Sequence, residues 1–137
     1  MTTVPRSPLA RTFAPLAGAT SLFILCQAAT AGQFIADEQA KVQLEVHSMV
    51  GYLTVLAALA TAAVAILVFR RTAPALLWGS VALAVMTALQ LVIGKLITDS
   101  EQDGWIPVHV PLAVLIFGVT IWLAVAAGRE RRAATAA

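Results

Sequence analysis

The chain contains only two histidines, His47 and His109, and each lies near the start of a long apolar segment. Neutral imidazole is a common metal ligand, and a six-coordinate b-type haem needs two of them, one on each face of the iron. If both segments enter a membrane from the same side, the two side chains lie at matching depth. The pair therefore predicts a bis-histidine haem site.

Four apolar segments dominate the sequence, at residues 12–31, 47–69, 75–98 and 108–127. The chain is 60% hydrophobic and 12% charged, whereas a soluble domain has about 25% charged residues. Each segment has the length of about 20 residues that a helix needs to cross the hydrocarbon layer. We therefore predict an all-α membrane protein, with a short tail at 1–11, a four-transmembrane-helix bundle at 12–127 and a basic tail at 128–137.

The first segment also has features of a cleaved signal peptide. Arg6 and Arg11 precede it, and Ala29-Thr30-Ala31 resembles a cleavage site. However, the apolar run is longer than the 7–15 residues usual for a signal peptide, and Pro15 is compatible with a first helical turn. We expect this helix to be retained.

The charges divide the loops into two sets. One side carries all seven arginines, namely Arg6, Arg11, Arg70, Arg71, Arg129, Arg131 and Arg132, whereas the other carries Lys41 and Lys95 among Asp37, Glu38, Glu45, Asp99, Glu101 and Asp103. The positive-inside rule then places both termini in the cytoplasm of a bacterial-type plasma membrane. We expect the basic tail to meet anionic lipid headgroups, and these scattered basic residues do not indicate nucleic-acid binding.

The loops also carry structural signals. The short link after residue 69 makes the second and third helices antiparallel neighbours; Thr72 is a candidate cap and Pro74 suits the first helical turn. Apolar residues scattered through 32–46 predict a short interfacial helix that runs into the second span.

The two halves of the chain resemble each other. Gln27 precedes His47 at nearly the spacing at which Gln90 precedes His109, and a small residue, Gly51 or Ala113, follows each histidine by one turn. This predicts two pseudo-symmetric helical hairpins related by an axis along the membrane normal.

The positions around the histidines suggest how haem is held. Gly51 and Ala113 share a helix face with the histidines, so their small size leaves room for a flat macrocycle, although small residues also allow close helix packing. Lys95 is the expected counter-charge for the haem propionates, with snorkelling to the interface as the alternative. Gln27 and Gln90 are expected to accept hydrogen bonds from the ligating imidazoles, or else to bond between helices.

Cys26 is the only cysteine, which excludes an internal disulfide and the attachment motif of c-type haem. We expect it to be a small packing residue. No catalytic residue is assigned.

The segments Gln43-Leu-Glu-Val-His47 and Leu89-Gln90-Leu-Val-Ile-Gly94, together with the helix that opens at His109, resemble one four-helix half of the haem A synthase family. That resemblance implies that His47 and His109 are an axial pair. In the family's catalytic half, a glutamate precedes the histidine by one more residue than Glu45 does, and an arginine stands where this chain has Ser48. With only one half present, the resemblance implies haem binding and electron transfer rather than methyl oxidation.

Our leading hypothesis is a protein with one bis-His haem b near the outer face, for electron transfer or haem handling, alone, as a homodimer or in a membrane protein complex. The alternatives are a non-haem accessory or assembly subunit, a haem-modifying oxidase and a small transporter. A zinc site would need a third ligand such as Glu45. Whether the protein is an enzyme stays open.

Overall fold

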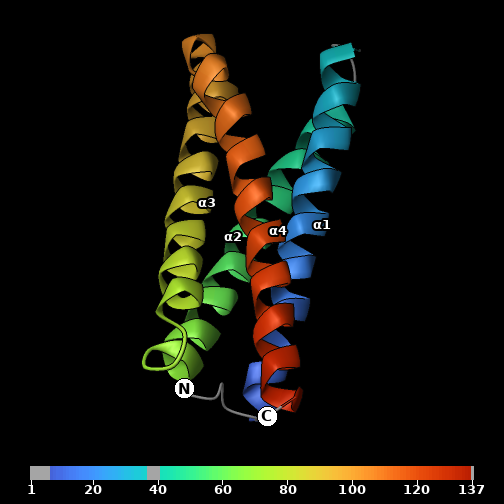
Figure 1. The fold of residues 1–137 in the computed structure, drawn as a ribbon. Coiled ribbons are helices and arrows are strands. Elements are labelled where there is room, and N and C mark those ends of the chain that lie inside the picture. The colour runs from blue at the N-terminus through green and yellow to red at the C-terminus, as the bar shows by residue number, and fades with distance from the viewer. Residues whose placement is uncertain (1–6, 37–40, 137) are drawn as a thin grey trace.

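The computed structural model describes residues 7–36 and 41–136, which form four long helices (Figure 1). These are α1 (Pro8–Ala36), α2 (Lys41–Phe69), α3 (Pro74–Ser100) and α4 (Ile106–Ala136), and a 3-10 turn, η1 (Asp103–Trp105), precedes α4. Each of the four is long and apolar enough to cross a membrane. The predicted all-α bundle with four candidate spans is confirmed.

The helices extend beyond the apolar segments that predicted them. In the described part of 32–46 there is no separate interfacial helix: α1 continues to Ala36 and α2 already begins at Lys41. The basic segment after residue 127 is likewise helical as far as Ala136. Alanine, arginine and glutamate have high helix propensity, so the helices extend beyond the apolar segments into the polar residues at their ends.

A tight turn joins α2 to α3. The amides of Thr72 and Ala73 both donate to the carbonyl of Phe69. Ala73 is the N-cap of α3 and Pro74 is its first residue, as predicted, but the predicted cap from Thr72 is wrong. The hydroxyl of Thr72 instead donates back to the carbonyl of Val68, which lies in the last turn of α2.

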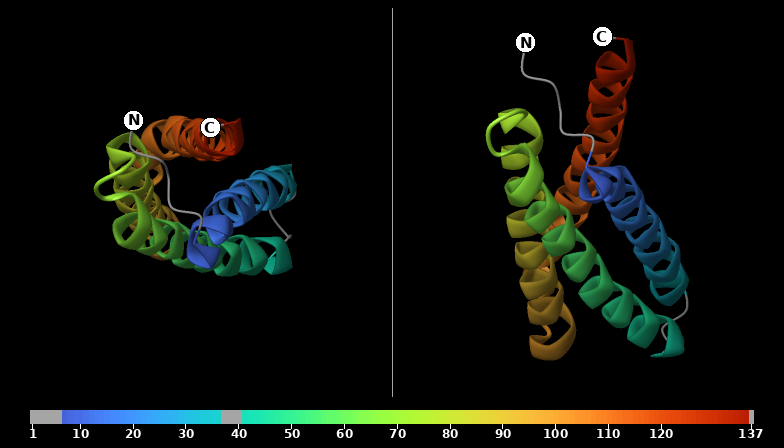
Figure 2. Two further views of the ribbon diagram at one scale, coloured as in Figure 1. Left: turned by 60° about the horizontal axis from the view of Figure 1, so that its bottom comes forward. Right: turned by 90° about the horizontal axis from the view of Figure 1, so that it is seen from below.

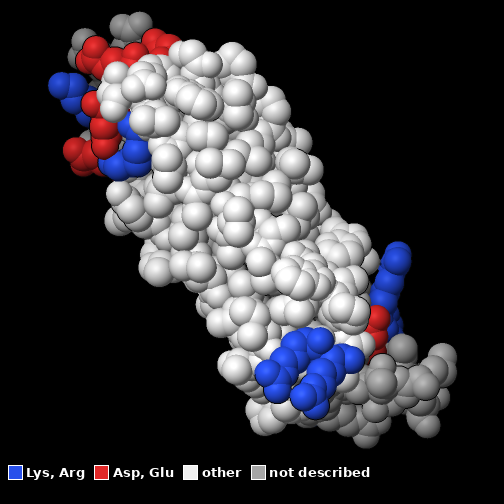
Figure 3. Space-filling model, turned by 90° about the vertical axis from the view of Figure 1, so that its left-hand side faces the viewer, with Lys and Arg blue, Asp and Glu red and all other residues white. Residues whose placement is uncertain are grey.

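Charged side chains gather at the two ends of the bundle, and the face between them in Figure 3 is uncharged. We call one the acidic end, where α1 and α3 finish and α2 and α4 begin; it carries Glu45, Asp99, Glu101 and Asp103 with Lys41 and Lys95. The opposite, basic end carries Arg70 and Arg71 between α2 and α3, and Arg129, Arg131 and Arg132 with Glu130 near the end of α4. The charge separation expected from the sequence is therefore present.

The helices form a ring in which each one packs against two neighbours (Figure 2). The neighbouring pairs are α1 with α2, α2 with α3, α3 with α4, and α4 with α1. Within the described residues, α2 does not contact α4 across the ring. The two helices that carry the histidines are therefore diagonal partners.

The apolar core fills the basic end and the middle of the bundle. Phe13 and Phe69 meet edge to face with ring centroids 5.1 Å apart, and the largest buried side chains farther in are Leu83, Ile116 and Leu123. Towards the acidic end, the α1–α2 pair diverges from the α3–α4 pair (Figure 1). Both histidines lie in this more open half.

Buried hydroxyl groups contribute a second kind of contact between helices. Most donate to a carbonyl one turn earlier in their own helix, but Ser21 on α1 also donates to Thr120 on α4 across 2.8 Å. Both side chains are buried. This bond links the first helix to the last.

The variant Ser21→Ala is therefore expected to lower the free energy of unfolding by about 0.6–2 kcal/mol, the range of hydrogen bonds between membrane helices. Unfolding in mixed micelles, titrated with a denaturing detergent, measures the change. Thr12→Ala is the matched control, because the exposed Thr12 hydroxyl donates only to Leu9 of its own helix. Equal stability of the two variants would show that the bond contributes nothing.

Candidate cofactor site

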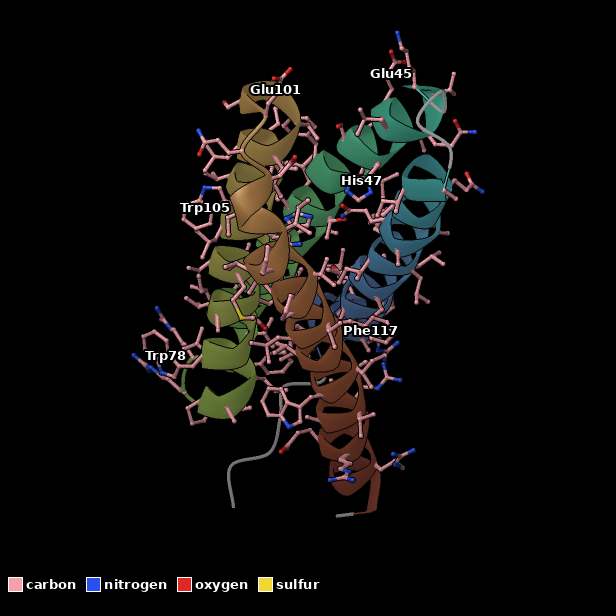
Figure 4. All side chains as sticks on the ribbon, turned by 90° about the horizontal axis from the view of Figure 1, so that it is seen from above. Glu45, His47, Trp78, Glu101, Trp105 and Phe117 are labelled. Carbon is pink, nitrogen blue, oxygen red and sulfur yellow. The ribbon has the colours of Figure 1, made fainter. Side chains whose placement is uncertain are left out.

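His47 points from α2 towards α1, whereas Glu45 points away at the acidic end (Figure 4). Its Nδ1 lies 3.0 Å from the backbone oxygen of Gln27. A carbonyl oxygen only accepts hydrogen bonds, so Nδ1 must be the nitrogen that carries the proton. In the neutral ring Nε2 then holds the lone pair, which is the arrangement of a metal-ligating histidine.

Two further polar contacts join α1 to α2 beside His47. The hydroxyl of Thr30 lies 3.3 Å from Nδ1 of His47, and the side-chain amide of Gln27 donates to Thr54 across 2.9 Å. The predicted contact between Gln27 and His47 thus exists, but it uses the backbone oxygen of Gln27 rather than its amide oxygen. The amide takes the alternative role of bonding between helices.

His109 lies against α3 at Gly94. A Cβ added to this glycine would come within 3.2 Å of Cε1 and 3.9 Å of Nδ1 of the His109 ring. Gln90, one turn before Gly94, donates from its amide nitrogen to the backbone oxygen of His109 across 2.9 Å. In both hairpins, then, the glutamine contacts the histidine of the following helix, through different atoms.

The two histidines lie in the same layer of the bundle. Gly51 on α2 packs against Leu91 on α3: a Cβ added to Gly51 would lie 3.4 Å from Cδ1 of Leu91. A helix rises 1.5 Å per residue, so His47 lies about 6 Å from Gly51 along α2, towards the acidic end. On α3, Gly94 lies about 4.5 Å from Leu91 in the same direction. Because Gly94 touches His109, both histidines lie at a similar depth.

Two polar atoms in this layer are buried and have no hydrogen-bond partner among the described residues. They are Nδ1 of His109 and Oε1 of Gln90. Leaving such an atom unpaired costs about 1–3 kcal/mol. This layer therefore contains a ring nitrogen and an amide oxygen that form no hydrogen bond with the described residues and are available to a bound group.

The remaining predicted site residues surround this layer. The side-chain ends of Leu91 and Gln27 lie beside Gly51, and a Cβ added to this glycine would be 3.7 Å from Oε1 of Gln27. Ala113 is half-buried on α4. Lys95 forms an ion pair with Asp99, with 2.8 Å between Nζ and Oδ2. Thus the predicted counter-charge already has an acidic partner on its own helix.

Thr30, Thr54 and Gly94 are contacts that the sequence did not single out as site residues. The one-turn spacing of Gln90 and Gly94 was a usable signal, because it places both on the face of α3 that meets His109. No comparable pattern marks Thr30 or Thr54, since threonine is common in membrane helices.

In residues 7–36 and 41–136, no three histidine, cysteine, aspartate or glutamate side chains come together to hold a metal ion, and zinc sites use at least three protein ligands. Cys26 is exposed on α1 rather than packed inside, so the expectation of a buried cysteine was wrong.

Comparison of the chain with models of known protein families, with curated proteins and with solved structures finds no match. The resemblance to the haem A synthase family stays a prediction from its short motifs.

Proposed function

We propose that this membrane protein binds one b-type haem between His47 and His109, for single-electron transfer or for haem handling. The observation that carries the proposal is that the chain's only two histidines lie in one layer of the bundle, on diagonal helices. When bound, a bis-histidine haem supplies one reversible electron acceptor that needs no open coordination position.

The residues around this layer fit such a group. The Gln27 carbonyl sets the tautomer of His47 so that Nε2 is the ligating atom. The buried and unpartnered Nδ1 of His109 and Oε1 of Gln90 are further polar groups for the cofactor environment. A macrocycle beside Gly51 requires the ends of Leu91 and Gln27 to rotate, and both are flexible side chains.

We further propose that both termini are cytoplasmic in a bacterial-type plasma membrane. The arginine-rich basic end supports this orientation through the positive-inside rule, and it puts the histidine layer near the outer face. Large exposed apolar side chains cover the helices, Leu67, Trp78 and Val114 among them. Lipid covers them in a monomer, and a homodimer or larger complex would cover part of them.

The optical spectrum tests the proposal. The full chain, purified in mild detergent after expression with ample haem, should show a sharp reduced α-band near ~560 nm, typical of a low-spin b-type haem. Pyridine extraction should recover about one haem per chain. A colourless protein that also fails to take up added haemin would overturn the proposal.

A specific observation favours one alternative, a non-haem assembly subunit. The bonds from Gln27 to Thr54 and from Gln90 to the His109 carbonyl join helices without any cofactor. That function predicts loss of a partner complex, with no spectral change, when exposed helix faces are mutated.

A further inference from the structure

The amide of Gln90 bonds through one of its two ends at the contact between α3 and α4. Its nitrogen donates to the backbone oxygen of His109 across 2.9 Å, whereas its oxygen, Oε1, is buried and accepts no hydrogen bond from the described residues. Nδ1 of His109 is likewise buried and has no hydrogen-bond partner among them. The two residues thus share one hydrogen bond and each has one further polar atom to satisfy.

Both of these atoms lie at the same helix contact. Gln90 and Gly94 are four residues apart, so they share a face of α3. The edge of the His109 ring faces this helix, because a Cβ added to Gly94 would be 3.2 Å from Cε1 and 3.9 Å from Nδ1. The backbone oxygen that holds the Gln90 amide belongs to the same residue as the ring. This bond keeps the amide close to the imidazole, so that rotation of the side chains can join Oε1 to Nδ1.

The chemistry of the two atoms determines which one donates. An amide oxygen only accepts hydrogen bonds, so Nδ1 must carry the proton, and Nε2 of the neutral ring then keeps its lone pair. Buried polar atoms in folded proteins are almost always hydrogen-bonded, and a donor and an acceptor at one contact satisfy each other. The backbone oxygen of Gln27 has the same effect on His47, whose Nδ1 lies 3.0 Å from it.

We infer that Gln90 is the positioning residue for His109. Its amide nitrogen holds the backbone of α4, and its Oε1 accepts the Nδ1 proton, which leaves Nε2 to bind iron. The role of Nε2 as an iron ligand rests on the proposed haem function. A hydrogen bond at Nδ1 makes the imidazole a stronger base at Nε2, and a stronger base stabilises ferric iron more than ferrous iron. Gln90 therefore lowers the reduction potential of the haem.

Nitrogen NMR tests the hydrogen bond without haem. His47 and His109 are the only histidines, so isotope labelling of histidine nitrogen in the full chain, in lipid bilayers, gives two rings, which His47→Gln assigns. At alkaline pH, where both rings are neutral, we expect the Nδ1–H tautomer in each. Gln90→Met keeps the length of the side chain and removes both polar ends, so it should convert most of His109 to the Nε2–H tautomer.

Gln27→Met is the matched control for this measurement. It removes the same groups from the glutamine that precedes the other histidine, but His47 is bonded to the backbone oxygen of residue 27, which the substitution retains. Both rings should therefore keep the Nδ1–H tautomer. An Nε2–H tautomer of His109 in the unmodified protein, or an unchanged tautomer in Gln90→Met, would overturn the inference.

The haem-loaded protein tests the effect on iron. Gln90→Met should weaken the affinity for ferric haem about 10–100-fold, the usual effect of losing a partner of a metal ligand, and the affinity for ferrous haem less. The reduction potential, measured by spectroelectrochemical titration, should therefore rise. Thr87→Val is the control, because the Thr87 hydroxyl donates to Ala84 within α3; its haem affinity and potential should match those of the unmodified protein.

The outcomes separate the two proposals. A merely structural role for Gln90 would weaken both oxidation states equally, so an unchanged potential in Gln90→Met would overturn the positioning role while the haem spectrum stands. A protein without haem would overturn the proposed function and the role of Nε2 as an iron ligand, whereas the tautomers would still decide whether Gln90 bonds to the His109 ring.

Discussion

The variants His47→Ala and His109→Ala are each expected to lose the spectrum of a low-spin, six-coordinate haem. Removing either imidazole leaves one axial position without its protein ligand, so the iron becomes high-spin or the cofactor is lost. Replacing even the outer partners of metal ligands weakens binding by about 10–100-fold, so loss of a ligand itself should weaken it at least that much. Haem titration followed by optical spectroscopy measures both effects.

Two neighbouring substitutions control for damage to the helices. Ser48→Ala and Val110→Ala alter the residues that directly follow the two histidines, on the half-buried and exposed surfaces of α2 and α4. Both should keep the low-spin spectrum. If His47→Ala and His109→Ala also keep it, the axial assignment is wrong, even if the protein proves to contain haem.

Gly94→Leu should have the second largest effect, because Gly94 is where α3 makes room for His109. An added Cβ would already lie 3.2 Å from Cε1 of that ring, and leucine adds three further carbons. Overpacking costs about 1–3 kcal/mol, and each 1.4 kcal/mol is a factor of about ten in affinity. We expect haem affinity to fall about tenfold or more as the imidazole is displaced.

Gly118→Leu is the matched control for Gly94→Leu. It places the same side chain on α4 where the described residues leave open space around the glycine. Its haem affinity, measured by the same titration, should equal that of the unmodified protein. Equal affinity in both variants would mean that the position of His109 against Gly94 has no part in holding a cofactor.

The sequence predicted the four spans because the bilayer imposes a simple requirement. A segment must be apolar over about 20 residues to cross it, and such runs are visible without any tertiary information. The same holds for the charge separation between the two ends. The helix ends were less predictable. α1 and α4 continue past the apolar residues, because residues of high helix propensity stay helical even where they are too polar to cross the membrane.

The site was only partly predictable. Two histidines after two glutamines indicated a layer of polar residues, and the contacts of Gln27 and Gln90 with the following helix agree with that interpretation. Lys95 pairs with Asp99 because the two residues are spaced i,i+4 on α3. This spacing is visible in the sequence, and it gives Lys95 a partner other than the haem propionates.

The sequence by itself determined the class of protein, the number of spans and the residues that could ligate iron. Only the tertiary structure decided that α2 and α4 are diagonal, that the Gln27 carbonyl orients His47, and that Gly94 rather than Gly51 touches a histidine ring. The physical reason is that apolar length and charge act locally along a chain, whereas helix rotation and side-chain contacts depend on packing among all four helices.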